Sequence, residues 1–231
     1  MRNKYTKTYF KQRDVLVFHM AETVKDLMKK NKLKKVLDVG CGSGLLVKYL
    51  QNEGFKTQGC DISPEAIKMA QIVNPKSIIK KASATNLPYK NNSFDLVVSI
   101  SVIEHLHQNE VEIFLKEARR VLIRNGRLFL VTPNFSSPLR IIQGKNWFGY
   151  SDPTHINYFT KHSLTETLKR NGFLENQFQF NLKYHDSINW EFPPPFAKFP
   201  KLLKLIIIYV LFSTPISYAR NSLWVFSKKI N

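Results

Sequence analysis

Short apolar runs alternate with longer amphipathic stretches through the first 132 residues. Apolar side chains recur at helical spacing from about residue 8 to 30, with Val17, Val24 and Met28 on one face. Apolar runs predict strands at 36–39, 55–60, 77–81, 94–100 and 127–132, and helices follow at 45–52, from Pro64 onward, and at 110–122. This alternation indicates βαβ units and an α/β fold with a doubly wound sheet.

The regular alternation stops after Pro133, and Asn125-Gly126 is predicted to be a turn before the fifth strand. Residues 133–160 are expected to form an irregular, aromatic-rich insertion. A helix at 161–171 and closing strands at 173–184 and 222–228 follow, with an apolar helix at 202–212. We expect one domain over 1–231: a helical cap (1–33), a core (34–132) and a substrate-side region (133–231).

The positive charge lies mainly outside the predicted core. The chain has 231 residues, 43% of them apolar, and a formal net charge of +18. Residues 1–35 hold eleven basic and three acidic side chains, residues 36–132 twelve and nine, and residues 133–231 twelve and five. Basic flanks suit a phosphate-rich or anionic-membrane partner, and a Lys-rich surface without such a partner would give the same pattern.

Cysteine content and hydropathy predict the cellular location. Cys41 and Cys60 are the two cysteines of the chain, too few for a disulfide framework, which fits a reducing cytoplasm. The N-terminal residues lack the apolar core of a signal peptide, and no apolar run is long enough to cross a bilayer. We therefore expect a cytoplasmic protein, with peripheral membrane contact as a further possibility.

Three alternate glycines, Gly40, Gly42 and Gly44, lie between the first predicted strand and its helix. A glycine-rich turn at this place lets backbone N–H groups approach a ligand closely. The dinucleotide fingerprint needs a sixth-position glycine where this chain has Leu45, so the spacing argues against NAD or FAD. A phosphate-binding P-loop is excluded as well, because no Gly-Lys-Ser/Thr follows.

Asp61 follows the second predicted strand, 23 residues after Asp38. A carboxylate at this position can accept hydrogen bonds from both hydroxyls of a ribose. Its alternative role is a cap before Ser63-Pro64, where the next helix begins.

The segments VLDVGCGSG (36–44), GCDIS (59–63) and LPYKNNSFDLVVS (87–99) resemble the ordered motifs of class I S-adenosylmethionine-dependent methyltransferases. The resemblance covers about residues 34–132. It implies a Rossmann-like, seven-stranded sheet whose last strand runs antiparallel. It also implies that S-adenosylmethionine lies across the carboxyl ends of the strands.

The resemblance also implies roles for individual residues. By motif position, the cofactor contacts are Asp38, Gly40, Cys41 and Gly42 at the methionyl part, Asp61 at the ribose, Ile62 at the adenine, and Ser99 at the end of the fourth strand. Asp38 has an alternative role in bracing the loop. Where the family often carries an Asp that touches the adenine amine, this chain has Ser83 followed by Ala84. We expect those two residues to contact the adenine more weakly.

The residues after the fourth strand bear on the methyl acceptor. The chain reads Ser-Ile-Ser-Val-Ile-Glu-His at 99–105 and lacks the Asn/Asp-Pro-Pro-aromatic motif of many enzymes that methylate amide or nucleic-acid nitrogens. VIEHL (102–106) and DPTHINYFTKHSL (152–164) resemble small-molecule O-methyltransferases, including those of ubiquinone biosynthesis. His105 and His155 are therefore candidate general bases, each with a structural alternative. Glu104-His105 alone is a weak metal signal, and no metal is expected.

Two further segments are aromatic or apolar. Trp147, Phe148, Tyr150, Tyr158 and Phe159 either line an acceptor pocket or pack the insertion onto the sheet. Residues 196–212 read FAKFPKLLKLIIIYVLF, which suits an interfacial helix on an anionic membrane or a lid over a lipid-like substrate. A core or dimer-interface helix is the alternative for this segment.

The leading functional hypothesis is S-adenosylmethionine-dependent O-methylation of a small or lipid-linked acceptor such as a glycan, quinone or envelope precursor. The alternative is an RNA-modifying methyltransferase, which the charge of +18 favours and the missing Pro-Pro motif opposes. A non-enzymatic cofactor-binding subunit is a third possibility, against which the intact glycine loop argues. Nucleic acid is thus a less favoured partner, and the sequence leaves the oligomeric state and the acceptor open.

Overall fold

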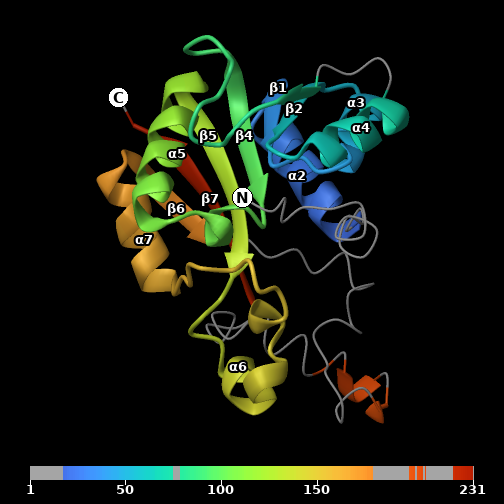
Figure 1. Ribbon diagram of the computed structural model, residues 1–231, viewed down its shortest axis with the longest axis vertical. Helices are drawn as coiled ribbons and strands as arrows, with labels where there is room; N and C mark the ends of the chain where they lie inside the picture. Colours follow the sequence, from blue (N-terminus) through green and yellow to red (C-terminus); the bar gives the residue numbers. More distant parts are fainter. Residues whose placement is uncertain are drawn as a thin grey trace.

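The computed structural model describes residues 18–74, 79–178, 198–200, 202–204, 206 and 221–230. A seven-stranded sheet, in the order β3-β2-β1-β4-β5-β7-β6, runs through its centre (Figure 1). The strands are β1 (Lys35–Val39), β2 (Lys56–Asp61), β3 (Ile79–Lys81), β4 (Phe94–Ile100), β5 (Leu122–Pro133), β6 (Phe173–Phe178) and β7 (Ser222–Lys229).

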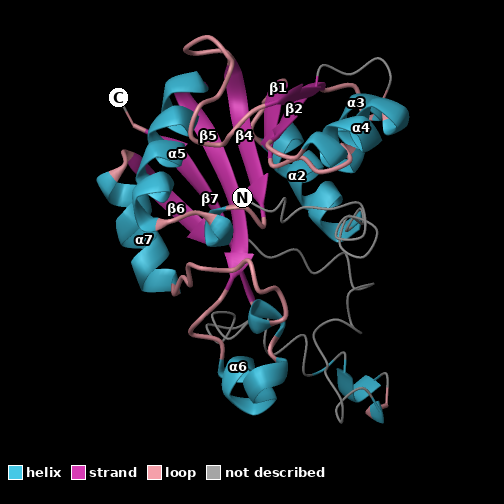
Figure 2. Cartoon of the chain, viewed as in Figure 1, coloured by secondary structure: helices cyan, strands magenta, loops and turns pink. Residues whose placement is uncertain are grey.

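Helices lie on both sides of this sheet (Figure 2). They are α2 (Phe18–Lys30), α3 (Leu45–Asn52), α4 (Pro64–Val73), α5 (Gln108–Val121) and α7 (Lys161–Arg170). A short helix, α6 (Pro138–Gln143), lies beyond the carboxyl end of β5 (Figure 2). Three short 3₁₀ turns complete the described elements: η1 (Ile103–His105), η2 (Gly144–Asn146) and η3 (Phe148–Tyr150). Local sequence explains where several of them begin. The Ser63 hydroxyl caps α4 by accepting the Ala66 N–H at 3.4 Å, and Thr160 opens α7 with a capping box.

Two apolar cores lie on opposite faces of the sheet. Successive residues of β4 alternate between them: Val97 packs with α5 and α7, whereas Leu96 and Val98 pack with α2 and α3. Each of these three side chains is fully buried. Burial on both faces explains why β4 is almost wholly apolar in sequence, as is typical of a central parallel strand.

The strand directions confirm the predicted sheet. β1 pairs in parallel with β2 and β4, β2 with β3, and β4 with β5. β7 is antiparallel to both β5 and β6. The carboxyl ends of β1 to β5 therefore meet at one edge of the sheet, which we call the carboxyl edge. The opposite edge, where these strands begin, is the amino edge.

One local prediction is wrong. Asn125-Gly126, predicted to be a turn before the fifth strand, lies inside β5, which begins at Leu122. Asn125 has φ of 60°, and the pairing between β4 and β5 slips between Phe94 and Leu96. The strand thus absorbs the turn-forming pair as a bulge, so pairing resumes at Arg127.

Several predictions concern residues outside the described part. These are residues 8–17 of the first helix, 77–78 and 179–184 of two strands, and most of the apolar helix at 202–212. Within the described residues, 202–204 and 206 are helical. Among the residues that the structure describes, no helix has both the length and the apolar character needed to cross a membrane.

Candidate active site

The loop between β1 and α3 turns sharply at the carboxyl edge. Gly40 has φ of +77°, and a Cβ added there would overlap the Cγ2 methyl of Val102, which follows β4. The N–H groups of Gly40 and Cys41 donate to the Cys60 carbonyl of β2 at 2.8 and 3.0 Å. Only glycine combines this left-handed backbone with so close an approach to a neighbouring strand. The loop therefore presents its backbone where β1, β2 and β4 meet.

Asp61, the last residue of β2, ties this loop to the next helix. Its Oδ2 accepts the Gly42 N–H at 3.0 Å, and its Oδ1 accepts the Ser63 N–H at 2.8 Å. The side chain is buried, with 9% of the residue exposed. Ser63 is the cap of α4, so Asp61 braces the backbone that leads into the helix and does not cap it. Each carboxylate oxygen can accept more than one hydrogen bond. Bracing of this backbone and binding of a ribose are compatible.

The candidate adenine contacts lie at the ends of β2 and β3. Ile62 is 55% exposed, an unusual position for an apolar side chain that directly follows a buried strand end. The Ala82 N–H donates to the Asp61 carbonyl at 2.8 Å, which brings the segment with Ser83 and Ala84 beside Asp61. The Ser83 hydroxyl is engaged in its own turn, because Oγ lies 2.8 Å from the Thr85 hydroxyl and accepts the Thr85 N–H.

Asp38, Ser99 and Cys41 are buried below the loop. Asp38 on β1 pairs with Val98 on β4, so Ser99 is the next residue along the adjacent strand. The Ser99 Oγ is fully buried and has no hydrogen-bond partner among the described residues. Burial, together with the nearby charges of Asp38 and Asp61, raises the pKa of the Cys41 thiol well above its ordinary value. Cys41 is therefore a neutral packing group.

Glu104 is a buried carboxyl group at the same edge, on η1 after β4. Burial raises its pKa to about 7, although the Thr132 hydroxyl donates to Oε2 at 3.0 Å. The Glu104 carbonyl accepts the N–H groups of Ile156 and Asn157 at 2.9 and 3.0 Å. These backbone bonds fasten the insertion to the end of β4.

The structure brings the two candidate histidines together. The rings of His105 and His155 have centroids 4.8 Å apart, and His155 Nε2 lies 4.0 Å from Glu104 Oε1. His155 Nδ1 lies 2.7 Å from the Gly149 carbonyl, which can only accept, so Nδ1 carries the proton. Sequence alone placed these histidines 50 residues apart with no indication of contact.

His105 is oriented by a chain of hydrogen bonds from the insertion. The Thr154 hydroxyl donates to Asp152 Oδ1 at 2.6 Å and lies 2.9 Å from His105 Nδ1. Because that hydroxyl proton is committed to the carboxylate, the hydroxyl oxygen accepts from His105 Nδ1–H. Neutral His105 therefore carries its basic lone pair on Nε2.

Glu104, His105 and His155 each offer one ligand atom, and these atoms lie within 4.8 Å of one another. One carboxylate and two imidazoles can bind a divalent cation. Glu104 Oε1 is also buried and has no hydrogen-bond partner within the described part of the chain. Sequence alone does not predict Glu104 as a site residue, because a Glu-His pair is a weak signal. The absence of a metal stays a prediction.

The aromatic residues of the insertion divide into two groups. Trp147 is fully buried and donates its indole N–H to Asn221 Oδ1 at 3.1 Å, and Phe159 belongs to the core beneath α5 and α7. Phe148 and Tyr150 are 40% and 39% exposed and stack edge-on against Trp147. Packing therefore accounts for Trp147 and Phe159, whereas Phe148 and Tyr150 present ring surface to solvent.

Comparison with known proteins agrees with this arrangement. A family model described as "Methyltransferase domain" matches residues 10–174. The ubiquinone biosynthesis O-methyltransferase of Pelagibacter ubique is 30% identical over 129 residues, covering 54% of this chain and 51% of that protein. The norajmaline N-methyltransferase of Rauvolfia serpentina is 40% identical over 97 residues, covering 39% and 32%. The chain thus spans about half or less of the length of these relatives.

Solved structures share the fold over most of the chain. A SAM-dependent methyltransferase from Archaeoglobus fulgidus aligns with a TM-score of 0.60 at 21% identity, covering 90% of this chain and 94% of that one. The Burkholderia thailandensis 1,6-didemethyltoxoflavin-N1-methyltransferase, with bound S-adenosylhomocysteine, aligns with a TM-score of 0.60 at 16% identity, covering 97% and 84%. The chain belongs to the methyltransferase domain family, and its resemblance to class I S-adenosylmethionine-dependent methyltransferases is confirmed.

Proposed function

We propose that this chain transfers a methyl group from S-adenosylmethionine to an oxygen of a small or lipid-linked acceptor. The observation that carries the proposal is the meeting of two groups of residues at one edge of the sheet. The glycine loop with Asp61 forms one group, and the pair His105–His155 forms the other. The first suits a nucleoside, and the second suits removal of a proton from an acceptor.

The residues present fit the cofactor. Gly40 lets the loop pack directly against the end of β4, because an added Cβ would overlap the Val102 Cγ2 methyl, and this close packing leaves the loop backbone as the surface that a ligand at the carboxyl edge would meet. The Asp61 carboxylate suits a ribose diol, and the exposed Ile62 suits one face of an adenine ring. Asp38, Cys41, Gly42, Ser83, Ala84 and Ser99 complete the proposed cofactor contacts. S-adenosylmethionine, when bound, supplies an electrophilic methyl group on a cationic sulfur.

His105 is the proposed general base. Bound S-adenosylmethionine would supply its methyl group to the acceptor oxygen and would leave as the neutral thioether, while the acceptor hydroxyl loses its proton. The hydroxyl proton passes to His105 Nε2, whose orientation Thr154 and Asp152 maintain. General-base catalysis of this kind contributes roughly 10²–10⁴-fold to a rate. Thr154 and Asp152 are positioning residues.

His155 and Glu104 are proposed to restrict the position of the His105 ring. The His155 ring contacts the His105 ring, and its Nε2 faces the buried Glu104 carboxyl group. His155 restricts His105 to the side of the site opened by the insertion, and Glu104 limits the positions that His155 can take. His155 is also the second candidate base if the acceptor lies nearer the aromatic side chains.

The substrate-side region 133–231 is proposed to enclose the acceptor over the core 34–132, with the helical cap 1–33 alongside. Phe148 and Tyr150 provide exposed ring surface near His155, which suits an apolar or sugar-containing acceptor. A cytoplasmic location with peripheral contact through residues 196–212 fits a lipid-linked acceptor. Loss of binding to anionic liposomes on deletion of 196–212 would support that contact.

The experiment that tests the proposal is transfer of labelled methyl groups to whole-cell lipid, glycan and RNA fractions. Label in lipid or glycan that disappears with His105→Gln supports the proposal. His162→Gln is the matched control, because His162 is an exposed histidine on α7. Label confined to the RNA fraction would favour the alternative that the charge of +18 suggests. Label in none of the fractions would contradict a lipid-linked or glycan acceptor and the RNA alternative alike.

A further inference from the structure

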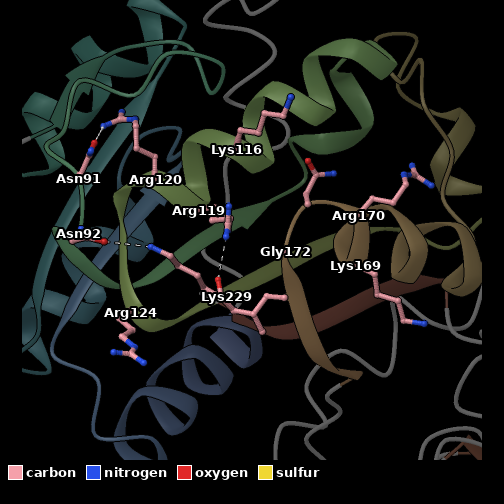
Figure 3. Close-up of a pocket in the computed structure, with 12 residues that line it drawn as sticks. Asn91, Asn92, Lys116, Arg119, Arg120, Arg124, Lys169, Arg170, Gly172 and Lys229 are labelled. Atoms are coloured by element: carbon pink, nitrogen blue, oxygen red, sulfur yellow. Dashed lines mark hydrogen bonds between the residues drawn. The ribbon is translucent and has the colours of Figure 1, made fainter.

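A hollow of about 800 Å³ lies at the amino edge of the sheet, and we call it the amino-edge groove. Its lining comes from the last turn of α5, the start of β5, the end of α7 and the end of β7 (Figure 3). Asn91 and Asn92 precede β4, and Gly172 precedes β6. Because the cofactor loop lies at the carboxyl edge, the groove belongs to a different part of the molecule.

The groove is strongly basic. Seven of its twelve lining residues are Lys or Arg, and none is Asp or Glu. Three of these cations are neutralised by carboxylates: Arg120 by Glu117, Lys169 by Glu166 and Arg170 by Glu112. The other four, Lys116, Arg119, Arg124 and Lys229, have no carboxylate partner among the residues that the structure describes.

These four cations are not explained by their hydrogen bonds within the protein. Lys229 donates to the carbonyl of Leu122 at 2.6 Å, and Arg119 donates to that of Ile230 at 3.4 Å, which leaves both charges uncompensated. Burial and the nearby Arg119 charge lower the pKa of Lys229. Lys116 and Arg124 are exposed at the mouth. The four positive charges repel one another, and an anion bound in the groove would reduce this repulsion.

Helix ends alone do not account for this concentration of charge. α5 and α7 both end here, and basic side chains stabilise the negative end of a helix dipole. The terminal carbonyls, however, already accept backbone N–H groups: Asn92 N–H donates to Arg120 and Gly172 N–H donates to Lys169, at 3.0 Å each. Each helix end carries a partial negative charge of only about half a unit, which is too small to account for seven cations.

Shape and lining indicate the ligand. The volume lies within the range of small-molecule sites. Arginine guanidinium groups match the geometry of phosphate oxygens, and asparagine amides add neutral donors. None of the twelve described lining residues is aromatic, so they offer no surface on which a nucleobase could stack. We infer that the amino-edge groove binds a small soluble ligand that carries two or more neighbouring phosphate groups.

Titration calorimetry with inorganic tripolyphosphate tests this inference on the full chain. We expect saturable binding of one tripolyphosphate per chain, weakened as ionic strength rises. The double variant Lys116→Glu/Arg124→Glu should weaken binding by at least about tenfold, because charge-assisted hydrogen bonds to phosphate are lost. Both side chains are exposed, and the neutral pair Lys116→Met/Arg124→Gln should show the same direction.

A matched control separates the groove from the overall charge. Lys30→Glu/Lys48→Glu makes an equal change in net charge at exposed positions on α2 and α3 and should leave affinity within about twofold. Thermal unfolding checks that all variants are folded. Equal weakening in both double variants would overturn the inference, as would the absence of saturable binding. Binding of single-stranded RNA or anionic vesicles without binding of tripolyphosphate would also overturn it.

Discussion

Replacement of Gly40 by alanine tests how closely the cofactor loop approaches the neighbouring strand. Two separate costs are expected at this position. A φ of +77° disfavours any side chain, and the added Cβ overlaps the Val102 Cγ2 methyl. Gly54 offers the comparison, because it has φ of +88° but no atom within 4 Å of an added Cβ. The difference between the two glycines isolates the steric overlap.

The magnitudes follow from these two environments. At Gly54, alanine should cost about 1–2 kcal/mol of the free energy of unfolding, from the left-handed backbone alone. At Gly40, overpacking adds about 1–3 kcal/mol, for a total of about 2–5 kcal/mol. Adding Val102→Ala to Gly40→Ala should recover the overpacking cost but not the backbone cost. The single variant Val102→Ala provides the fourth corner of this cycle.

Urea unfolding followed by circular dichroism measures each free energy. The account predicts that Gly40→Ala is the more damaging of the two glycine variants and that Val102→Ala partly rescues it. It would be refuted if Gly40→Ala and Gly54→Ala cost the same, or if Val102→Ala made Gly40→Ala worse. Either outcome would mean that the loop does not rest against the end of β4.

Three further predictions concern other parts of the molecule. His105→Gln should lower kcat for methyl transfer by about 10²–10⁴-fold with a much smaller change in the affinity for S-adenosylhomocysteine, and equal loss of both would contradict a role as base. The Arg120 guanidinium holds the pKa of Glu117 below its ordinary value of 4.5. This stabilisation is fully present above that value and is lost as the pH falls through the lowered pKa, so the cost of Glu117→Gln should be largest near pH 7 and should shrink as the pH falls below 4.5; a pH-independent difference would contradict it. Trp147→Phe removes the bond to Asn221 and should cost about 1–3 kcal/mol in urea unfolding, whereas no change would place Trp147 outside the core.

Local pattern is sufficient to predict most of the fold. The strand β4 is apolar because both of its faces are buried, so its sequence alone predicts a central strand. The α4 boundary follows from Ser63 and Pro64, whose capping preferences depend only on neighbouring residues. The turn predicted at Asn125-Gly126 is wrong because it also rests on local preference alone. The preference of these two residues for a turn is real, but pairing of the surrounding residues with β4 absorbs it as a bulge.

Some residues of the site can also be predicted from local sequence, whereas others depend on the tertiary fold. The glycine loop and Asp61 are recognisable because their spacing is set by a single βαβ unit. The contact between His105 and His155 depends on how the insertion folds back over β4, which no local pattern encodes. The sequence offers Glu104 only as part of a weak Glu-His signal, because its full burial next to the His155 imidazole is a tertiary property. The amino-edge groove is likewise not predictable from local sequence, because its cations come from four separate segments that only the tertiary fold brings together.

Calorimetry with S-adenosylhomocysteine on Asp61→Asn tests whether the glycine loop and Asp61 hold S-adenosylmethionine. Asp95→Asn is a matched control, because Asp95 likewise accepts two backbone N–H groups, from Lys34 and Lys35 at 2.7 and 2.9 Å, but at the amino edge. The account predicts saturable binding by the native chain, loss of about tenfold or more in Asp61→Asn, and unchanged affinity in Asp95→Asn. Absence of binding by the native chain, or equal affinity in both variants, would contradict it.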